Sequence, residues 1–257
     1  MLGSRLFASP GPSQYFVVLL PAFPLSNKMW EGAVEAFENL RDDTSFLLID
    51  FPGFGDSAMQ ASWTMQIVAA EIYSEIKKHT RGRIVLGGLS MGGYEAFAFY
   101  REYSSMLSGL VLSNTKPQAD NDAMKRYRES FALDALKRGP DAAIDRLYSK
   151  FVTENTDPAI AIDIQNWIRE AGGEAMNAAL KAMANRADSS DLLRLISVPS
   201  LVISSTQDEI IPNTDMQAMA MQLPDSTYIE MKGAAHLTAA ERPQEWAEAL
   251  ASFLDRI

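Results

Sequence analysis

The stretch Ile84-Val-Leu-Gly-Gly-Leu-Ser-Met-Gly-Gly-Tyr-Glu-Ala96 decides the fold of this chain. It begins with apolar residues typical of a buried strand and continues into residues that can form a helix. The pattern Gly88-x-Ser90-x-Gly92 lies between the two, where a sharp turn needs small residues on both sides of the serine. Such a turn exposes the serine hydroxyl above the sheet and aims the N–H of Met91 at a developing oxyanion. The pattern predicts a nucleophile at Ser90, with a glycine-rich turn around an incidental serine as the alternative.

Short apolar runs alternate with helical periodicity over much of the chain. Most of these runs are apolar throughout, which is typical of strands buried on both faces of a parallel sheet. Strands are expected at residues 15–20, 46–49, 84–86, 110–112, 201–203 and 228–231. Helices are expected between them, for example at 64–79 and 243–257, where apolar residues recur on one face. This alternation predicts an α/β fold with a mostly parallel, doubly wound sheet.

One long region breaks the alternation of strands and helices. It contains no strand candidate, and Gly-Pro, Asp-Pro and Gly-Gly pairs separate its helical patterns. Those patterns occur at residues 121–137, 141–152, 157–171 and 174–187. The sequence therefore predicts a core formed by residues 1–115 and 191–257, with an all-helical insertion over residues 116–190.

A serine nucleophile needs a base, because its hydroxyl is barely ionised at neutral pH. The chain has two histidines, His79 and His236. His236 lies in a loop between the last expected strand and the terminal helix. His79 ends a helix among cationic residues, where an exposed histidine interacts favourably with the helix dipole. We therefore expect His236 to be the base, with a loop or core histidine of no catalytic role as the alternative.

The base in turn needs a carboxylate that orients its ring. Asp208 closely follows the next-to-last expected strand, so it lies at the carboxyl edge of the sheet, where ligands bind in open α/β folds. Glu209 is adjacent and should point elsewhere, while Asp215 should belong to the following helix. We expect both to be solvated surface acids. The nucleophile, the acid and the base then follow one another in the order expected for this type of sheet.

The composition excludes several other kinds of protein. The chain of 257 residues has no cysteine, which excludes disulfide scaffolds, thiolate nucleophiles and zinc ribbons. Two histidines are too few for a three-histidine metal site, and no spacing of carboxylates indicates a metal. The net charge of −10 argues against nucleic acid and anionic membranes as partners, because both require basic residues. We expect no cofactor, no membrane insertion and a cytoplasmic location.

The chain resembles the α/β-hydrolase superfamily, and within it the small capped esterases and the members similar to enol-lactonases. The stretches that carry the resemblance are Gly-Leu-Ser90-Met-Gly-Gly, Asp50-Phe-Pro-Gly-Phe-Gly-Asp-Ser57, Asp208 with Pro212, Gly233-Ala-Ala-His236 and Glu241-Arg-Pro243. They extend over nearly the whole chain. The resemblance implies the fold of that family, with the insertion as a helical cap after the sixth strand. It also implies that Ser90, Asp208 and His236 form a catalytic triad at a nucleophile elbow.

The resemblance also assigns a second oxyanion donor. In the relatives a His-Gly pair follows an early strand, and the next residue offers a backbone N–H to the oxyanion. The matching stretch here is Leu20-Pro-Ala-Phe-Pro24, so the second donor would be Phe23, beside Met91. Pro21 and Ala22 replace the pair. Pro21 has no N–H and fixes its own φ, while Ala22 resists positive φ.

The stretch from Asp50 to Asp56 also invites a nucleotide-binding interpretation. It lacks the G-x-G-x-x-G spacing and the lysine of a phosphate-binding loop. We therefore expect Gly53 and Gly55 to be turn residues after a strand.

Methionine and aromatic side chains are frequent in the insertion. We expect some of them to form an adaptable apolar wall over Ser90 and to contact the substrate. The candidate substrate-binding residues are Tyr127, Phe131 and Trp167 of the insertion, together with Leu237 beside His236. Packing of the inserted helices against one another is the alternative role. The basic residues at 125, 126 and 128 could meet a substrate carboxylate, although a solvated helix face is their more common role.

The expected chemistry is acyl transfer to water, in which Ser90 attacks the carbonyl of a small, largely apolar ester or lactone. A carboxylic ester hydrolase is therefore expected. A C–C bond hydrolase or lyase on the same three residues is one alternative. A second is a ligand-binding protein of low turnover, which the altered Pro21-Ala22 pair supports best. A third is an interaction protein that docks through the insertion, which no sequence feature favours. Serine rather than aspartate at position 90 argues against epoxide hydrolases and haloalkane dehalogenases.

Overall fold

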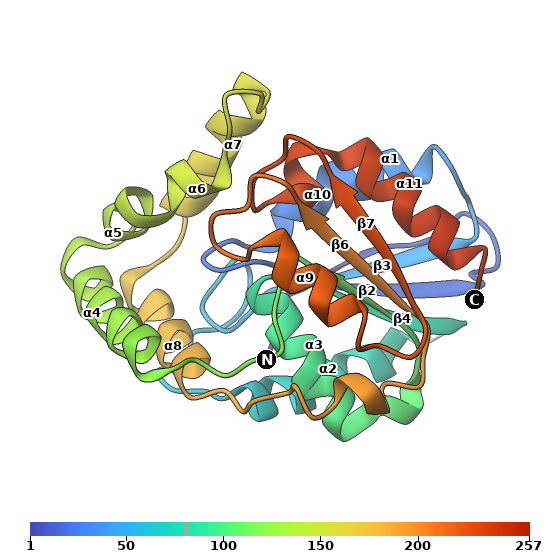
Figure 1. Ribbon diagram of the computed structural model, residues 1–257, viewed down its shortest axis with the longest axis horizontal. Coiled ribbons are helices and arrows are strands. Elements are labelled where there is room, and N and C mark those ends of the chain that lie inside the picture. Colours follow the sequence, from blue (N-terminus) through green and yellow to red (C-terminus); the bar gives the residue numbers. More distant parts are fainter. Residues whose placement is uncertain (80–81) are drawn as a thin grey trace.

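The computed structural model describes residues 1–79 and 82–257, and a seven-stranded sheet forms the centre of this part of the chain (Figure 1). The strands are β1 (Ser4–Phe7), β2 (Tyr15–Leu20), β3 (Thr44–Ile49), β4 (Arg83–Leu89), β5 (Leu107–Ser113), β6 (Ser200–Ser205) and β7 (Ser226–Met231). Their order across the sheet is β1-β3-β2-β4-β5-β6-β7. All pairings are parallel except that of β1 with β3. The predicted mostly parallel sheet is therefore confirmed.

Each strand expected from the sequence occurs, and the central ones are buried along their length. The sequence reasoning misses β1, because this short edge strand is partly exposed and carries no continuous apolar run. The register aligns the carboxyl ends of the central strands: Leu20 lies opposite Gly88, and Ser113 lies opposite both Leu89 and Ile203. Residues that follow these strands therefore meet at one edge of the sheet.

Helices cover both faces of the sheet. The helices of the core are α1 (Glu31–Glu38), α2 (Met65–His79), α3 (Met91–Tyr103), α9 (Asn213–Ala220), α10 (Thr238–Glu241) and α11 (Pro243–Leu254), with short 3₁₀ turns at Asn27–Trp30, Ser104–Met106 and Leu193–Leu195. α1 and α11 pack together on one face, and α2 and α3 pack together on the other (Figure 1). This is the doubly wound arrangement that the alternating sequence predicts. None of the helices in the described ranges has the length and hydropathy that a membrane crossing requires.

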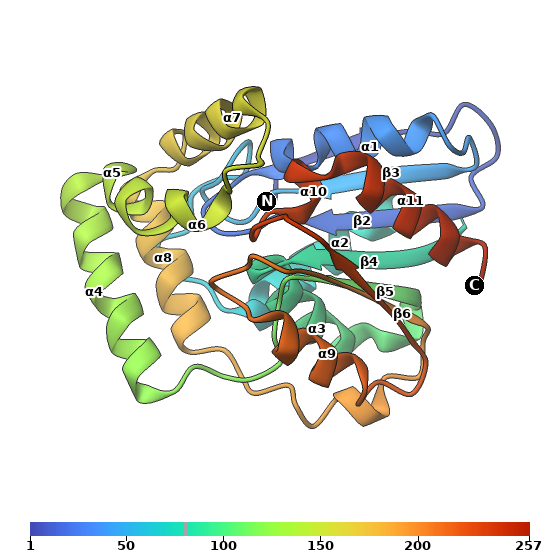
Figure 2. The ribbon, with the colours of Figure 1, turned by 45° about the horizontal axis from the view of Figure 1, so that its top comes forward.

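The helical insertion lies between β5 and β6. It consists of α4 (Asp122–Arg138), α5 (Asp141–Ala143), a π-helical turn (Ile144–Tyr148), α6 (Ser149–Phe151), α7 (Pro158–Arg169) and α8 (Gly173–Ala184). These helices gather beyond one end of the sheet, on the side toward which the parallel strands point (Figure 2). The resemblance predicts the insertion after a sixth strand. In this chain it follows the fifth, because a single antiparallel strand, β1, precedes the parallel ones. The division into a core and a cap domain stays a prediction.

A buried aspartate fixes the turn after β3. Oδ1 of Asp50 accepts from the N–H of Asn27 at 2.6 Å, and Oδ2 accepts from the Asn27 amide at 2.9 Å and the Asp56 N–H at 3.0 Å. Gly53 and Gly55 have φ values of 83° and 50°, which confirms them as turn residues. A Cβ added at Gly55 would overlap the Asp50 carboxylate.

We expect Gly55→Ala to lower the free energy of unfolding by about 2–4 kcal/mol, because alanine is strained at positive φ and its Cβ would displace Asp50. Gly11→Ala is the matched control, since nothing lies within 4 Å of a Cβ there. Chemical denaturation of both variants measures the difference. Equal stability of the two variants would contradict this account of the turn.

Candidate active site

Ser90 occupies the turn between β4 and α3 in a strained backbone conformation, with φ 57° and ψ −112°. Its N–H donates to the carbonyl of Ser113 at 3.0 Å, and the hydroxyl of Thr115 donates to its carbonyl at 2.8 Å. A Cβ at Gly88 would overlap the backbone of Gly92. The glycines are therefore required for this turn, as the sequence predicts, and the neighbouring strand holds the strain in place.

His236 lies in the loop between β7 and α10. Its Nδ1 donates a hydrogen bond to Oδ2 of Asp208 at 2.8 Å, and its side chain is 1% exposed. The ring of Phe151 stacks on the imidazole with centroids 5.7 Å apart and planes 12° from parallel. One ring nitrogen is thus fixed by a carboxylate, and one ring face is covered by the insertion.

Asp208 follows β6 and is held by several donors. Its Oδ1 accepts from the N–H groups of Ile210 and Ile211 at 2.8 and 3.0 Å, and its Oδ2 also accepts from the side chain of Asn114 at 2.9 Å. Burial acts to raise the pKa of the Asp208 carboxyl. The charge and hydrogen bond of His236, together with the Ile211 and Asn114 donors, outweigh burial and hold the pKa below its usual range. Asp208 therefore stays ionised beside the imidazole.

Asn114, at the end of β5, is a residue that the sequence reasoning misses. Its amide donates to Asp208 and, at 2.9 Å, to the hydroxyl of Ser205, and its oxygen accepts from Thr238 at 2.9 Å. It has a positive φ of 42° and is fully buried. The signal in the sequence is a polar side chain directly after a buried strand, at the carboxyl edge of the sheet. Asn114 joins the strand of the acid to the helix that follows the base.

A second carboxylate holds the histidine loop from the other side. Oε2 of Glu241 accepts from the N–H of Ala235 at 3.2 Å and from the hydroxyl of Thr156 at 2.9 Å. The hydroxyl of Thr153 also donates to the carbonyl of Gly233 at 3.3 Å. Burial raises the pKa of Glu241 above its ordinary value. The insertion is thus hydrogen-bonded to the same loop that presents His236.

Ser90 and His236 are not hydrogen-bonded to each other among the described residues. The structure brings Asp208 and His236 into direct contact and puts Ser90 at the same edge of the sheet, where β4 and β5 end. A hydrogen bond between nucleophile and base is often long outside the reacting complex. The assignment of the three residues as a catalytic triad stays a prediction.

The two proposed oxyanion donors lie at neighbouring strand ends. The N–H of Met91 starts α3, and the N–H of Phe23 follows β2; neither is hydrogen-bonded to another described residue. Among the described residues other than glycine, only Ser90 and Asn114 have positive φ. Ala22 therefore does not have the left-handed backbone conformation that a glycine would allow at this position. The role of both N–H groups stays a prediction.

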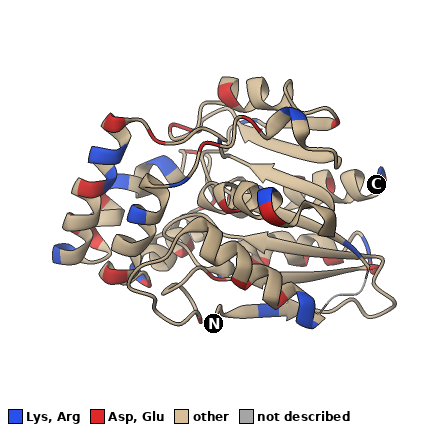
Figure 3. Ribbon diagram, turned by 90° about the horizontal axis from the view of Figure 1, so that it is seen from below, with Lys and Arg blue, Asp and Glu red and all other residues tan. Residues whose placement is uncertain are grey.

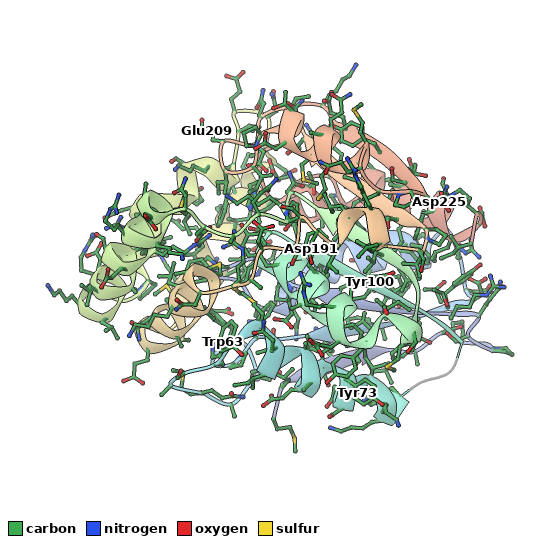
Figure 4. The ribbon with its side chains drawn as sticks, turned by 60° about the horizontal axis from the view of Figure 1, so that its bottom comes forward. Trp63, Tyr73, Tyr100, Asp191, Glu209 and Asp225 are labelled. Carbon is green, nitrogen blue, oxygen red and sulfur yellow. The ribbon has the colours of Figure 1, made fainter. Side chains whose placement is uncertain are left out.

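The rival residues lie away from this cluster. His79 ends α2, just before the amino end of β4, and its Nε2 lies 3.4 Å from Oε1 of Glu75 on its own helix. Glu209 is exposed and points outward (Figure 4), and Asp215 is exposed in the first turn of α9. Glu209 and Asp215 are surface acids, as the sequence predicts, whereas the side chain of His79 ends its helix as expected but is only 29% exposed.

The candidate substrate-binding residues differ in their surroundings. Phe131 is buried on α4, and its ring meets that of Phe23 edge-on, with centroids 5.8 Å apart. Tyr127 is 38% exposed and contacts Phe131. Trp167 is half-buried and packs against the core, and Leu237, which follows His236 in the chain, is buried. Phe131 is thus a candidate of the insertion whose ring contacts that of Phe23, the residue of a proposed oxyanion donor. Among the described residues, no group of three His, Asp or Glu side chains could hold a metal ion.

The chain is similar to known hydrolases in sequence and in structure. The Alpha/beta hydrolase family matches residues 17–249. A thermophilic esterase from Thermogutta terrifontis, solved with malate bound, is 32% identical with a TM-score of 0.92, covering 99% of this chain and 93% of that one. The enol-lactonase from Burkholderia xenovorans LB400 is 22% identical with a TM-score of 0.88, covering 99% and 96%. The 2-hydroxy-6-oxo-6-(2'-aminophenyl)hexa-2,4-dienoic acid hydrolase of Metapseudomonas resinovorans is 24% identical, covering 82% and 73%.

We expect Asn114→Ala to lower the free energy of unfolding by about 1–3 kcal/mol at pH 7, because it leaves buried partners without a hydrogen bond. The lowered pKa of Asp208 stabilises the fold above its unfolded value of about 4, and this contribution is lost as pH falls through the folded value. Asn114 supplies part of that lowering. The deficit of the variant should therefore be largest above about pH 4 and narrow below it.

Chemical denaturation between pH 3 and pH 8 measures this difference. Asn155→Ala is the control, because Asn155 is exposed and its side chain makes no hydrogen bond to another described residue. A deficit that stays constant with pH would mean that Asn114 acts independently of the Asp208 charge.

Proposed function

This chain belongs to the alpha/beta hydrolase family, and on that premise we propose that it is a serine hydrolase that cleaves a carboxylic ester or lactone through an acyl-enzyme. The observation that carries the proposal is the buried 2.8 Å hydrogen bond between His236 and Asp208, at the sheet edge where Ser90 occupies a strained turn. A histidine with a purely structural role does not need a hydrogen bond from its ring to an ionised carboxylate. A general base does.

In the first half of the reaction, Ser90 Oγ attacks the carbonyl carbon of the substrate while Nε2 of His236 takes the hydroxyl proton. The imidazolium gives this proton to the departing alkoxide as the C–O bond breaks, which leaves the acyl group on Ser90. Asp208 holds Nδ1 in the correct tautomer and stabilises the imidazolium without itself taking a proton. In the second half, His236 activates a water that releases the acid.

The developing negative charge on the carbonyl oxygen needs donors that are fixed in advance. The N–H groups of Met91 and Phe23 are proposed to supply them, each from a residue that follows a central strand. The loss of one such donor costs about 2.7–4 kcal/mol of barrier in a comparable site. The rigid packing around Ser90 would keep the Met91 donor in position.

The insertion is proposed to act as the cap over this site. Phe131, Phe23 and Phe54 form an edge-on aromatic cluster beside the proposed oxyanion donor, and Phe151 covers the base. Such a wall favours an apolar acyl or alcohol group. The esterase from Thermogutta terrifontis supports an ester substrate, and the enol-lactonase from Burkholderia xenovorans LB400 supports a lactone.

A C–C bond hydrolase on the same triad is the second candidate. The similarity to the dienoic acid hydrolase of Metapseudomonas resinovorans favours it. The two candidates share the nucleophile and base and differ in the leaving group, which would be a carbanion rather than an alkoxide. Turnover of β-diketone substrates compared with simple esters distinguishes them. A ligand-binding protein of low turnover is the remaining alternative.

We expect Ser90→Ala and His236→Ala each to lower kcat on a 4-nitrophenyl ester by about 10⁴–10⁶-fold. Both should also abolish single covalent labelling by a fluorophosphonate, because labelling needs the same activated hydroxyl. His79→Ala is the control and should retain activity and labelling. Intact mass and initial rates measure both effects. A folded wild type with neither labelling nor turnover would contradict the proposal, and labelling without turnover on any substrate would favour the binding protein.

We expect Phe131→Leu to shift the acyl preference toward longer chains, because it removes part of a rigid wall. The ratio of kcat/KM for a long over a short 4-nitrophenyl ester should change by about tenfold. Phe37→Leu is the matched control, since Phe37 is equally buried and also meets another ring edge-on, but lies in α1. An equal change of this ratio in both variants would show that a general loss of stability, and not a change in the wall of the site, causes the effect.

A further inference from the structure

A cleft of about 620 Å³ lies between the inserted helices and the loop before α2, and Ser90, Asp208 and His236 do not line it. One wall consists of α4 and the end of α8. The opposite wall contains Trp63, which lies where α8 approaches the start of α2 (Figure 4). The volume is that of a site for an organic molecule rather than for a single ion.

The charge of the lining is opposite to that of the protein. Lys and Arg are frequent on the inserted helices, with Asp and Glu between them (Figure 3). The charged residues that line the cleft are Lys125, Arg126, Arg128, Lys181 and Arg186, with Asp122 and Glu129 as the acids. The cleft is therefore cationic in a chain whose net charge is −10. Concave cationic surfaces concentrate anions.

The inner wall holds two guanidinium groups against one carboxylate. Nη1 of Arg186 lies 2.8 Å from Oδ1 of Asp120, and Nε of Arg128 donates to Oδ2 of the same residue. Arg186 also lies over the ring of Tyr94, with Cζ 4.0 Å from the ring centroid. All these side chains are largely buried, so this part of the wall carries an excess positive charge that water screens poorly.

The wall also has hydrogen-bond donors without acceptors. Nε of Arg186 and Nε1 of Trp63 are both buried and have no hydrogen-bond partner among the described residues. Both side chains line the cleft. Buried donors of this kind are costly to leave unpaired. Both donors lie beneath the surface of the wall, so a ligand in the cleft would contact the cationic groups that line it rather than these two atoms.

The outer wall adds exposed cations. Lys125, Arg126 and Lys181 are exposed and form no ion pair with any other described residue. Apolar atoms of Met65 and Leu180 lie in the same lining. A ligand that satisfies both features carries an apolar body and a negatively charged, planar acceptor that matches a guanidinium fork.

We propose that this cleft binds a small organic carboxylate. Asp120 already occupies the inner wall as such a group, and a ligand carboxylate would add the acceptor for the remaining cations. The site is separate from the catalytic residues and does not depend on the proposed hydrolase activity. Its ligand is either an independent molecule or the acidic end of a substrate that extends into the cleft from the proposed active site.

Calorimetric titration of the wild type with phthalate at low ionic strength tests the proposal, with neutral phthalamide as the matched ligand. We expect phthalate to bind with Kd below about 1 mM and phthalamide at least tenfold more weakly. The variant Arg126→Gln/Lys181→Gln should weaken phthalate by about tenfold or more. Lys137→Gln/Lys232→Gln removes the same charge from exposed positions outside the cleft and should leave Kd unchanged.

Equal binding of phthalate and phthalamide, or equal weakening in the two double variants, would overturn the proposal.

A second measurement distinguishes an independent ligand from the acidic end of a substrate. It compares the KM of an acidic ester, mono-4-nitrophenyl glutarate, with the KM of a neutral ester, 4-nitrophenyl butyrate. If Arg126→Gln/Lys181→Gln removes a preference for the acidic ester, the cleft receives the acidic end of the substrate. If phthalate binding weakens while both KM values are unchanged, the cleft takes an independent carboxylate. Because phthalate binding is measured without turnover, failure of the hydrolase proposal would not affect it.

Discussion

The hydrogen bond from Nδ1 of His236 to Oδ2 of Asp208 is the contact on which the rest of the site depends. It joins two loops that follow different strands, β6 and β7, so it forms only if the carboxyl ends of these strands are in register. It is buried, so every remaining lone pair of the carboxylate needs a donor. Two backbone N–H groups and Asn114 supply these donors. Burial acts to raise the pKa of Asp208, and the imidazole, the Ile211 N–H and Asn114 outweigh it and keep the pKa low.

The insertion is attached to the loop that contains His236 by stacking and by hydrogen bonds. Phe151 stacks on the imidazole, and Thr156 donates to Glu241, which in turn holds the loop before the histidine. The base is therefore positioned from the core through Asp208 and from the insertion through Glu241. These contacts fix the position of the insertion relative to the loop that contains His236.

Local sequence patterns predict the parts of this structure that depend on local chemistry. The glycines around Ser90 predict its turn, because no larger residue fits there, and the apolar runs predict the central strands. The edge strand β1 escapes prediction, because half of its side chains face solvent. Asn114 escapes prediction for a different reason: its partners, at positions 205, 208 and 238, are distant in the chain. The cations of the cleft resemble an ordinary solvated helix face until the fold brings Trp63 opposite them.

The most direct test of the account is to find the acyl group on the chain during turnover. A hindered ester such as 4-nitrophenyl trimethylacetate slows the release of the acyl group, so an acyl-enzyme should accumulate. Acid quenching within the first turnover, followed by peptide mapping, should find one trimethylacetyl group on the peptide that contains Ser90. Release of 4-nitrophenolate with no acylated peptide, or with the acyl group on a peptide without Ser90, would contradict the account.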